Sequence, residues 1–173
     1  PIIDLAPAGV IVPMVNTPEI AQAAVAACRY PPTGNRGCGT RRSVGYGAGD
    51  FAEYLKLSER EPLVIVQIEH IEAVRNIDAI LKTPGLGSVC IGPYDLSGSM
   101  GKLGQVDDPE VVKVIEEICT KTIKAGVMLG GFGSPFPVWR RRGLNWTAIC
   151  GDAGCLFSHA KGLLDEVRKE QGE

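Results

Sequence analysis

The chain has 173 residues, of which 45% are hydrophobic and 22% charged, and its formal net charge is −2. These values are typical of one globular domain with a sizeable core, so we expect residues 1–173 to form a single domain. The densest basic cluster, Arg140-Arg141-Arg142, is too short to follow a nucleic-acid backbone, and nucleic acid is not an expected partner. No apolar run approaches the about 20 residues of a membrane span, and no signal-peptide pattern is present. We therefore expect a cytoplasmic protein with no membrane partner.

Short apolar runs alternate along the chain with segments of helical periodicity. The runs have the length and composition of buried strands, which are predicted at residues 9–15, 63–68, 88–92, 127–131 and 146–150. Start and stop signals predict helices at residues 18–29, 51–59, 71–81, 109–125, 139–142 and 153–169. A long loop rich in Gly, Pro and Arg fills most of the interval at residues 30–50. The last helix has one apolar side, formed by Leu156, Phe157, Ala160, Leu163, Leu164 and Val167.

Strand and helix patterns alternate five times, which indicates a parallel α/β fold. A complete barrel of eight βα units typically takes about 250 residues, so five units are too few. The chain also has no initiator Met, and Pro1-Ile2-Ile3-Asp4-Leu5 resembles the end of a helix rather than its beginning. We therefore expect a partial TIM (β/α)₈ barrel, about the last five βα units of a longer protein.

Two acidic residues follow consecutive predicted strands. Glu69 comes directly after residues 63–68, and Asp95 follows residues 88–92. Because the carboxyl ends of parallel strands converge on one rim of such a fold, these two side chains are expected to lie close together. Paired carboxylates without Cys or His suit a hard divalent cation such as Mg²⁺ or Mn²⁺. The alternative is that they are exposed loop acids, or partners of Arg in structural ion pairs.

The six cysteines form no CxxC pair and no regular framework; they are Cys28, Cys38, Cys90, Cys119, Cys150 and Cys155. Cys90 lies in an apolar strand and Cys119 on the apolar face of a helix, so both are expected to be core residues. A zinc site is not indicated, because His70 and His159 are far in sequence from any pair of cysteines. A reducing compartment fits this pattern best.

Five short motifs occur in order along the chain: residues 12–15 (Val-Pro-Met-Val), 29–37 (Arg-Tyr-Pro-Pro-x-Gly-x-Arg-Gly), 67–69 (Gln-Ile-Glu), 91–97 (Ile-Gly-Pro-x-Asp-Leu-Ser) and 100–101 (Met-Gly). In this order and spacing the chain resembles the HpcH/HpaI aldolase family, over nearly all of its 173 residues. The family comprises divalent-metal-dependent aldolases and lyases of the phosphoenolpyruvate/pyruvate barrel superfamily.

The resemblance implies a class II aldolase or carbon–carbon lyase that acts through a pyruvate enolate, as in 2,4-dihydroxyhept-2-enedioate aldolase. Glu69 and Asp95 match the ligands of Mg²⁺, Mn²⁺ or Co²⁺, which polarises the 2-oxo group and stabilises the enolate. Gln67, Gly92, Pro93 and Tyr94 match positions around the 2-oxo acid, either pyruvate or oxaloacetate. Asp4 matches the acid that orients a catalytic His. The second substrate is an aldehyde, and a homo-oligomer is expected because family sites lie near subunit interfaces.

The chain also departs from the family pattern. The catalytic His and the substrate-binding Arg belong to N-terminal units that it does not contain, and neither His70 nor His159 matches that His. Ala6-Pro7 stands where a Gly-Ala pair is usual. The alternative is therefore a truncated, catalytically silent member that retains metal or 2-oxo acid binding, or only subunit association.

Three further features each have a functional and a structural interpretation. The loop at residues 30–39, with Arg36, is either an anion cradle or a rigid turn at a subunit contact. The Gly-rich residues 130–134 could approach a ligand, although they lack the spacing of a dinucleotide site. His70 either reaches the metal or bonds to backbone or water, and the second interpretation is preferred. Trp139 and Trp146 are expected to pack.

Overall fold

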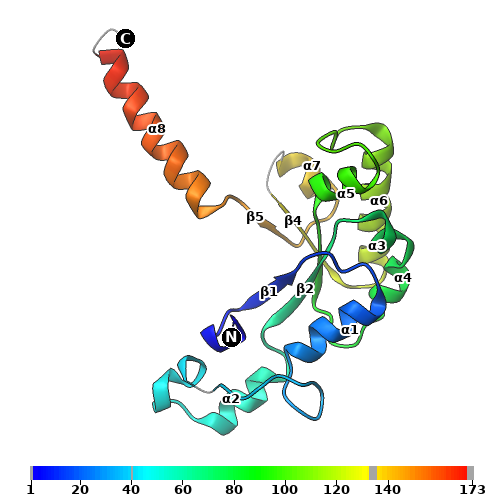
Figure 1. Ribbon diagram of the computed structural model, residues 1–173, viewed down its shortest axis with the longest axis vertical. Coiled ribbons are helices and arrows are strands. Elements are labelled where there is room, and N and C mark those ends of the chain that lie inside the picture. The colour runs from blue at the N-terminus through cyan, green and yellow to red at the C-terminus, as the bar shows by residue number, and fades with distance from the viewer. Residues whose placement is uncertain (1, 40, 133–135, 171–173) are drawn as a thin grey trace.

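The computed structural model describes residues 2–39, 41–132 and 136–170, and it contains one sheet of parallel strands in sequence order. The strands are β1 (Gly9–Val12), β2 (Leu63–Ile68), β3 (Ser88–Ile91), β4 (Met128–Phe132) and β5 (Trp146–Ala148). Each pairs in parallel with its neighbours in sequence, so that Ile65 lies opposite Ile11 on one side and Ser88 on the other. The sheet curls into half of a barrel (Figure 1). The predicted partial (β/α)₈ barrel is confirmed.

Helices connect the strands, and four of them begin after a residue whose side chain caps the helix. The helices are α1 (Pro18–Ala27), α2 (Phe51–Ser58), α3 (Ile71–Arg75), α4 (Ile77–Ile80), α5 (Pro93–Ser99), α6 (Pro109–Lys124), α7 (Phe136–Arg141) and α8 (Asp152–Glu170), with 3₁₀ turns η1 (Ile2–Leu5) and η2 (Arg42–Gly47). The four capped helices are α1, α2, α3 and α6. The Thr17 hydroxyl accepts from the amide of Ile20, and the Asp108 carboxylate accepts from the amide of Glu110. Pro follows both capping residues, at the position where its missing N–H costs nothing. Among the described residues, no helix is both long and apolar enough to cross a membrane.

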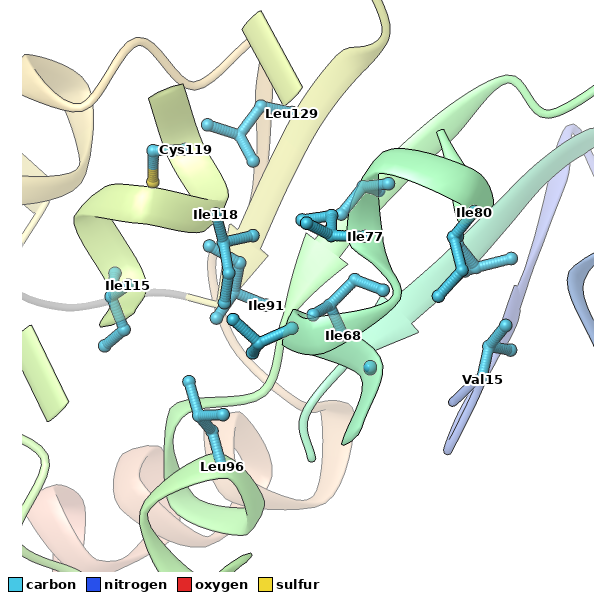
Figure 2. Packing of buried hydrophobic residues seen from close by; sticks show 14 of the residues in the cluster. Val15, Ile68, Ile77, Ile80, Ile91, Leu96, Ile115, Ile118, Cys119 and Leu129 are labelled. Carbon is cyan, nitrogen blue, oxygen red and sulfur yellow. The ribbon is translucent and has the colours of Figure 1, made fainter. Parts of the chain in front are cut away.

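The main core lies between the sheet and the helices that cover one of its faces, α1, α3, α4 and α6 (Figure 1). Ile68, Ile91 and Leu129 from the strands pack with Ile77, Ile80, Ile115 and Ile118 from the helices (Figure 2). All seven side chains are buried, and each contributes about 1.5–3 kcal/mol of hydrophobic stabilisation. This core holds β2 and β3 rigidly side by side, and Glu69 and Asp95 follow these two strands.

Several predicted boundaries were wrong, and local backbone chemistry explains two of them. β1 ends at Val12 rather than residue 15, because Pro13 has no N–H for the ladder and Met14 adopts a left-handed φ of 54°. The helix predicted at 71–81 is two short helices, interrupted at Asn76, whose side-chain amide donates to the Asn16 carbonyl at 2.9 Å. Helix α5 was not predicted. The last strand ends at Ala148 rather than residue 150.

Helix α8 extends away from the sheet and the other helices (Figure 1). None of its described residues is buried, although the sequence pattern gives it one apolar side. Leu156 and Phe157 are 73% and 69% exposed, and Leu163, Leu164 and Val167 are each about half exposed. The apolar side of α8 therefore has no packing partner within the described chain.

Candidate metal and substrate site

Glu69 is the buried centre of the site. It follows β2 directly, and only 3% of the residue is exposed. Its Oε1 accepts a hydrogen bond from the Met14 amide at 2.7 Å, and its Oε2 accepts one from the Gln67 side-chain amide. The Met14 amide is directed by a left-handed backbone conformation, which typically costs about 1–3 kcal/mol and is found at functional sites. Met14 was not among the site residues predicted from the sequence. Pro13, which cannot continue a strand, was the feature that could have indicated an irregular backbone at this position.

Asp95 is the second carboxylate, and it lies in the first turn of α5. Its side chain lies close enough to that of Glu69 to raise the pKa of the Glu69 carboxyl. Burial is the main cause that raises the pKa of Glu69; the Met14 amide opposes this, and Asp95 raises the pKa further. Neighbouring carboxylates disfavour each other's charged form, and a bound cation would offset that repulsion. The expectation that Glu69 and Asp95 lie together is met.

Gly92 lies between β3 and α5. Because it has no side chain, it leaves the space that the Glu69 side chain occupies. A Cβ at this position would lie 2.5 Å from Glu69 Oε2, 2.6 Å from Gln67 Nε2 and 2.8 Å from Glu69 Cβ. Gly92 is also the residue before the first turn of α5, with Pro93 at the first helical position. Gln67 and Gly92 therefore lie against Glu69, Pro93 follows at the start of α5, and the Tyr94 side chain is 65% exposed. The substrate-binding roles of these four residues stay predictions.

The two carboxylates fit a divalent cation. Hard cations bind carboxylate oxygens, and Mg²⁺ commonly takes only one or two carboxylates and completes its shell with water and substrate oxygens. The described residues contain no cluster of three or more His, Cys, Asp or Glu side chains, so the chain offers these two ligands and no larger cage. Burial is the main cause of the raised pKa of Glu69, and a cation would relieve the repulsion from Asp95 that adds to it. The donor set is suited to Mg²⁺, Mn²⁺ or Co²⁺.

Asp4 is not brought to this site. It lies in η1 before β1, whereas Glu69 and Asp95 follow β2 and β3, so the parallel register places Asp4 towards the opposite end of the sheet. Its Oδ1 accepts a hydrogen bond from Arg36 Nη2 at 3.2 Å. The predicted role of Asp4 in orienting a His stays a prediction.

The loop at residues 30–39 is held by contacts within the chain. Besides its bond to Asp4, Arg36 donates to the Tyr54 hydroxyl at 2.7 Å and lies 4.5 Å over the Tyr30 ring. Arg29 is buried and donates to the Pro62 carbonyl at 3.1 Å. These contacts favour the rigid-turn interpretation over an anion cradle. The predicted subunit contact at this loop stays a prediction.

The other candidate positions have structural roles. His70 caps α3, since its Nδ1 accepts from the Glu72 amide at 3.2 Å, in agreement with the preferred interpretation. Gly130 accommodates Trp146, because a Cβ there would overlap the indole ring, whose Nε1 donates to Ser88 Oγ at 2.8 Å. The candidates Gly133 and Ser134 lie outside the described residues. Cys90, Cys119 and Trp139 are buried, as expected.

The comparisons with known proteins agree with these observations. The sequence profile of the HpcH/HpaI aldolase/citrate lyase family matches residues 2–136. The chain is 36% identical over 166 residues to 5-keto-4-deoxy-D-glucarate aldolase of Escherichia coli O139:H28, a match that covers 92% of this chain and 63% of the relative. The chain thus spans less than two thirds of the length of that relative.

Solved structures give the same result. The HpcH/HpaI aldolase of Desulfitobacterium hafniense DCB-2 superimposes with a TM-score of 0.83 and 29% identity, over 96% of this chain and 66% of that one. An HpcH/HpaI aldolase/citrate lyase family protein of Burkholderia cenocepacia J2315 gives 0.81 and 29%, over 92% and 65% of the two chains. The profile, the relative and both structures agree, and the chain belongs to the HpcH/HpaI aldolase/citrate lyase family.

Proposed function

We propose that this chain forms the metal-binding part of a divalent-metal-dependent aldolase, which makes or cleaves a carbon–carbon bond of a 2-oxo acid through a pyruvate enolate. The observation that carries the proposal is that Glu69 and Asp95 lie beside each other, at the carboxyl ends of two adjacent parallel strands in a chain of this family. The similar E. coli protein is an aldolase, which supports this reaction class and a small-molecule substrate. An aldehyde is the proposed second substrate, and the cytoplasm is the proposed location.

In this proposal Glu69 and Asp95 hold Mg²⁺, Mn²⁺ or Co²⁺. The bound ion supplies Lewis-acid polarisation of the 2-oxo group. The chain's own residues fix the carboxylate that holds it: the Met14 amide and the Gln67 amide donate to the two oxygens of Glu69. The small Gly92 keeps the space beside Glu69 open, and the first-turn amides of α5 have no carbonyl partner within that helix. These amides are those of Tyr94 and Asp95, because Pro93 has no N–H, and they are the proposed contacts of the substrate carboxylate.

Exchange of the pyruvate methyl protons into D₂O, followed by NMR, tests this proposal. We expect exchange that requires Mg²⁺ or Mn²⁺ and falls to background in Glu69→Gln, because the amide cannot replace the anionic ligand. Glu72→Gln, which changes an exposed acid on α3, is the matched control and should keep wild-type exchange. Absence of metal-dependent exchange in the wild-type chain would contradict enolate formation by this chain and favour a member that only binds.

We also propose that the protein is a homo-oligomer in which the apolar side of α8 packs against a second copy. The support is that α8 extends away from the sheet and carries five large apolar side chains, each about half exposed or more. They are Leu156, Phe157, Leu163, Leu164 and Val167. Fully burying one exposed side chain of this kind yields about 1.5–3 kcal/mol before the costs of association, and the three that are already half buried yield correspondingly less.

Light scattering coupled to gel filtration checks the oligomer. The wild-type chain should elute as a defined oligomer, and Leu164→Lys should shift its mass to that of the monomer, because a charge would be buried at the contact. Ser158→Lys, outside the set of apolar residues on the same helix, should leave the mass unchanged. A monomeric wild-type chain, or equal effects of both substitutions, would contradict the proposed surface.

A further inference from the structure

Two cysteines flank the point where α8 begins. Cys150 follows β5 by two residues, and Cys155 lies in α8. Both are free thiols and both are exposed. Neither has a role in the proposed metal site, whose acids follow β2 and β3.

Helix geometry explains why these two side chains meet. The Gly151 carbonyl accepts the hydrogen bond from the Cys155 amide at 2.9 Å, which makes Gly151 the N-cap of α8. Cys150 then precedes the cap and Cys155 is the fourth residue of the helix. Side chains at these two positions characteristically contact each other across the first turn. In agreement with this placement, the side chain of Cys150 is the main cause that raises the pKa of Cys155.

We propose that Cys150 and Cys155 form a reversible disulfide by exchange with a low-molecular-weight disulfide such as oxidised glutathione. The Cys150 thiolate attacks one sulfur of the oxidant, which forms a mixed disulfide and releases one glutathione. Cys155 then loses its proton and attacks the sulfur of Cys150, which releases the second glutathione. Two electrons and two protons leave the cysteine pair, and one oxidised glutathione becomes two reduced ones.

The environment supports this order of events. The Cys150 side chain raises the pKa of Cys155, so Cys155 keeps its proton and acts second. Both sulfurs are accessible to a small oxidant. The bridge would close a ring of only a few residues, which limits its stabilising effect and, with its exposure, keeps it easy to reduce. A labile bridge of this kind is compatible with a reducing compartment.

Oxidation would fix the junction between β5 and α8. Ile149 is 84% exposed, and a Cβ added at Gly151 or Gly154 would meet no atom of another segment within 4 Å, so no other part of the described chain packs against this junction there. A covalent link from residue 150 to residue 155 removes the freedom of this segment and holds the first turn of α8 closed. This inference does not depend on the proposed aldolase function, because it concerns residues outside that site.

Mass spectrometry of the whole chain tests the proposal. The protein is equilibrated with mixtures of reduced and oxidised glutathione, quenched with acid, alkylated and digested with trypsin. Residues 143–161 form one tryptic peptide that contains both cysteines, because no Lys or Arg lies between Arg142 and Lys161. An internal disulfide lowers the mass of this peptide by about 2 Da, the two hydrogens lost. We expect this form to dominate under oxidising mixtures and to disappear with dithiothreitol.

The chain provides its own controls. Cys38 is exposed but is not paired with a second cysteine as Cys150 is with Cys155, so it should carry at most one glutathione. The buried Cys28, Cys90 and Cys119 should stay unmodified. Cys150→Ser and Cys155→Ser should each convert the internal disulfide into a single glutathione adduct on the remaining cysteine. A wild-type peptide that carries two glutathiones, or two alkyl groups, at every oxidant ratio would overturn the proposal.

Hydrogen exchange measures the consequence for α8. The amides of residues 153–156 should exchange severalfold more slowly in the oxidised protein than in the reduced protein, because the bridge opposes opening of the first turn. The two serine variants should show no such difference between oxidising and reducing buffers. Equal exchange in the two redox forms of the wild-type chain would overturn the anchoring of α8.

Discussion

Gly92→Ala is expected to disrupt the site and to destabilise the fold by about 1–3 kcal/mol, the range for inserting a methyl group into a tightly packed position. The added Cβ would lie within 2.8 Å of three atoms of Glu69 and Gln67, and these side chains are held in place by their own hydrogen bonds. Displacing Glu69 also separates it from Asp95, so the variant should lose metal binding together with stability. Urea denaturation and a Mn²⁺ titration followed by electron paramagnetic resonance measure the two effects.

Gly37→Ala is the matched control for this substitution. A Cβ added at Gly37 would meet no atom within 4 Å, and Gly37 is not among the glycines with positive φ. Its replacement should therefore leave the urea midpoint and the Mn²⁺ affinity close to those of the wild type. If Gly92→Ala behaved in the same way as Gly37→Ala, the close packing around Glu69 would not be a requirement of the site.

The positions of Glu69 and Asp95 were predictable from sequence because they depend on the order of strands and helices in a parallel α/β fold. Apolar runs of strand length alternate with helices, parallel strands end on one rim, and an acid follows each of two consecutive runs. The register then places the acids together without any knowledge of side-chain packing. The same alternation was sufficient to predict the half-barrel.

The details that complete the site depend on local backbone conformation, which periodicity does not report. Nothing in the pattern indicates that Met14 turns left-handed and directs its amide to Glu69. Helix α5 was missed because Pro93 and two glycines, Gly92 and Gly98, resemble a loop, although Pro is well suited to the first position of a helix. Asp4 was assigned through the family motif alone, and its observed partner is Arg36.

The apolar side of α8 shows a different limit of sequence reasoning. Helical spacing correctly predicts which residues share a side, but it does not say what that side packs against. The structure leaves Leu156 and Phe157 on that side exposed. The partner of such a helix is decided by tertiary or quaternary contacts between distant segments.

Glu69→Gln is expected to make the metal-free protein more stable at pH 8 than the wild type, by about 1 kcal/mol, the scale on which replacing a buried charge becomes favourable. Burial and Asp95 raise the pKa of Glu69 in the folded chain above its unfolded value. The folded state therefore binds the proton more tightly, and the stability of the wild type falls as pH rises through that interval. Glutamine has no proton to lose, so the variant should not show this part of the decrease. At pH 4, below the ordinary pKa of a Glu carboxyl and further below the raised pKa of Glu69, the two proteins should differ least.

A divalent cation should reverse the order of stability at pH 8, and this reversal separates a metal site from a simple carboxyl pair. Mg²⁺ at 100 times its dissociation constant stabilises a folded protein by about 2.7 kcal/mol when it binds only the folded state. The wild type should gain this amount, and Glu69→Gln should gain almost none, since one of its two anionic ligands is gone. Thermal unfolding at pH 4 and pH 8, with and without Mg²⁺, measures all four conditions, and Glu72→Gln should follow the wild type in each. The site is inferred from Glu69 lying beside Asp95, so Glu69 should be a ligand of the ion. Equal stabilisation of the wild type and Glu69→Gln by Mg²⁺ would therefore mean that the ion binds elsewhere.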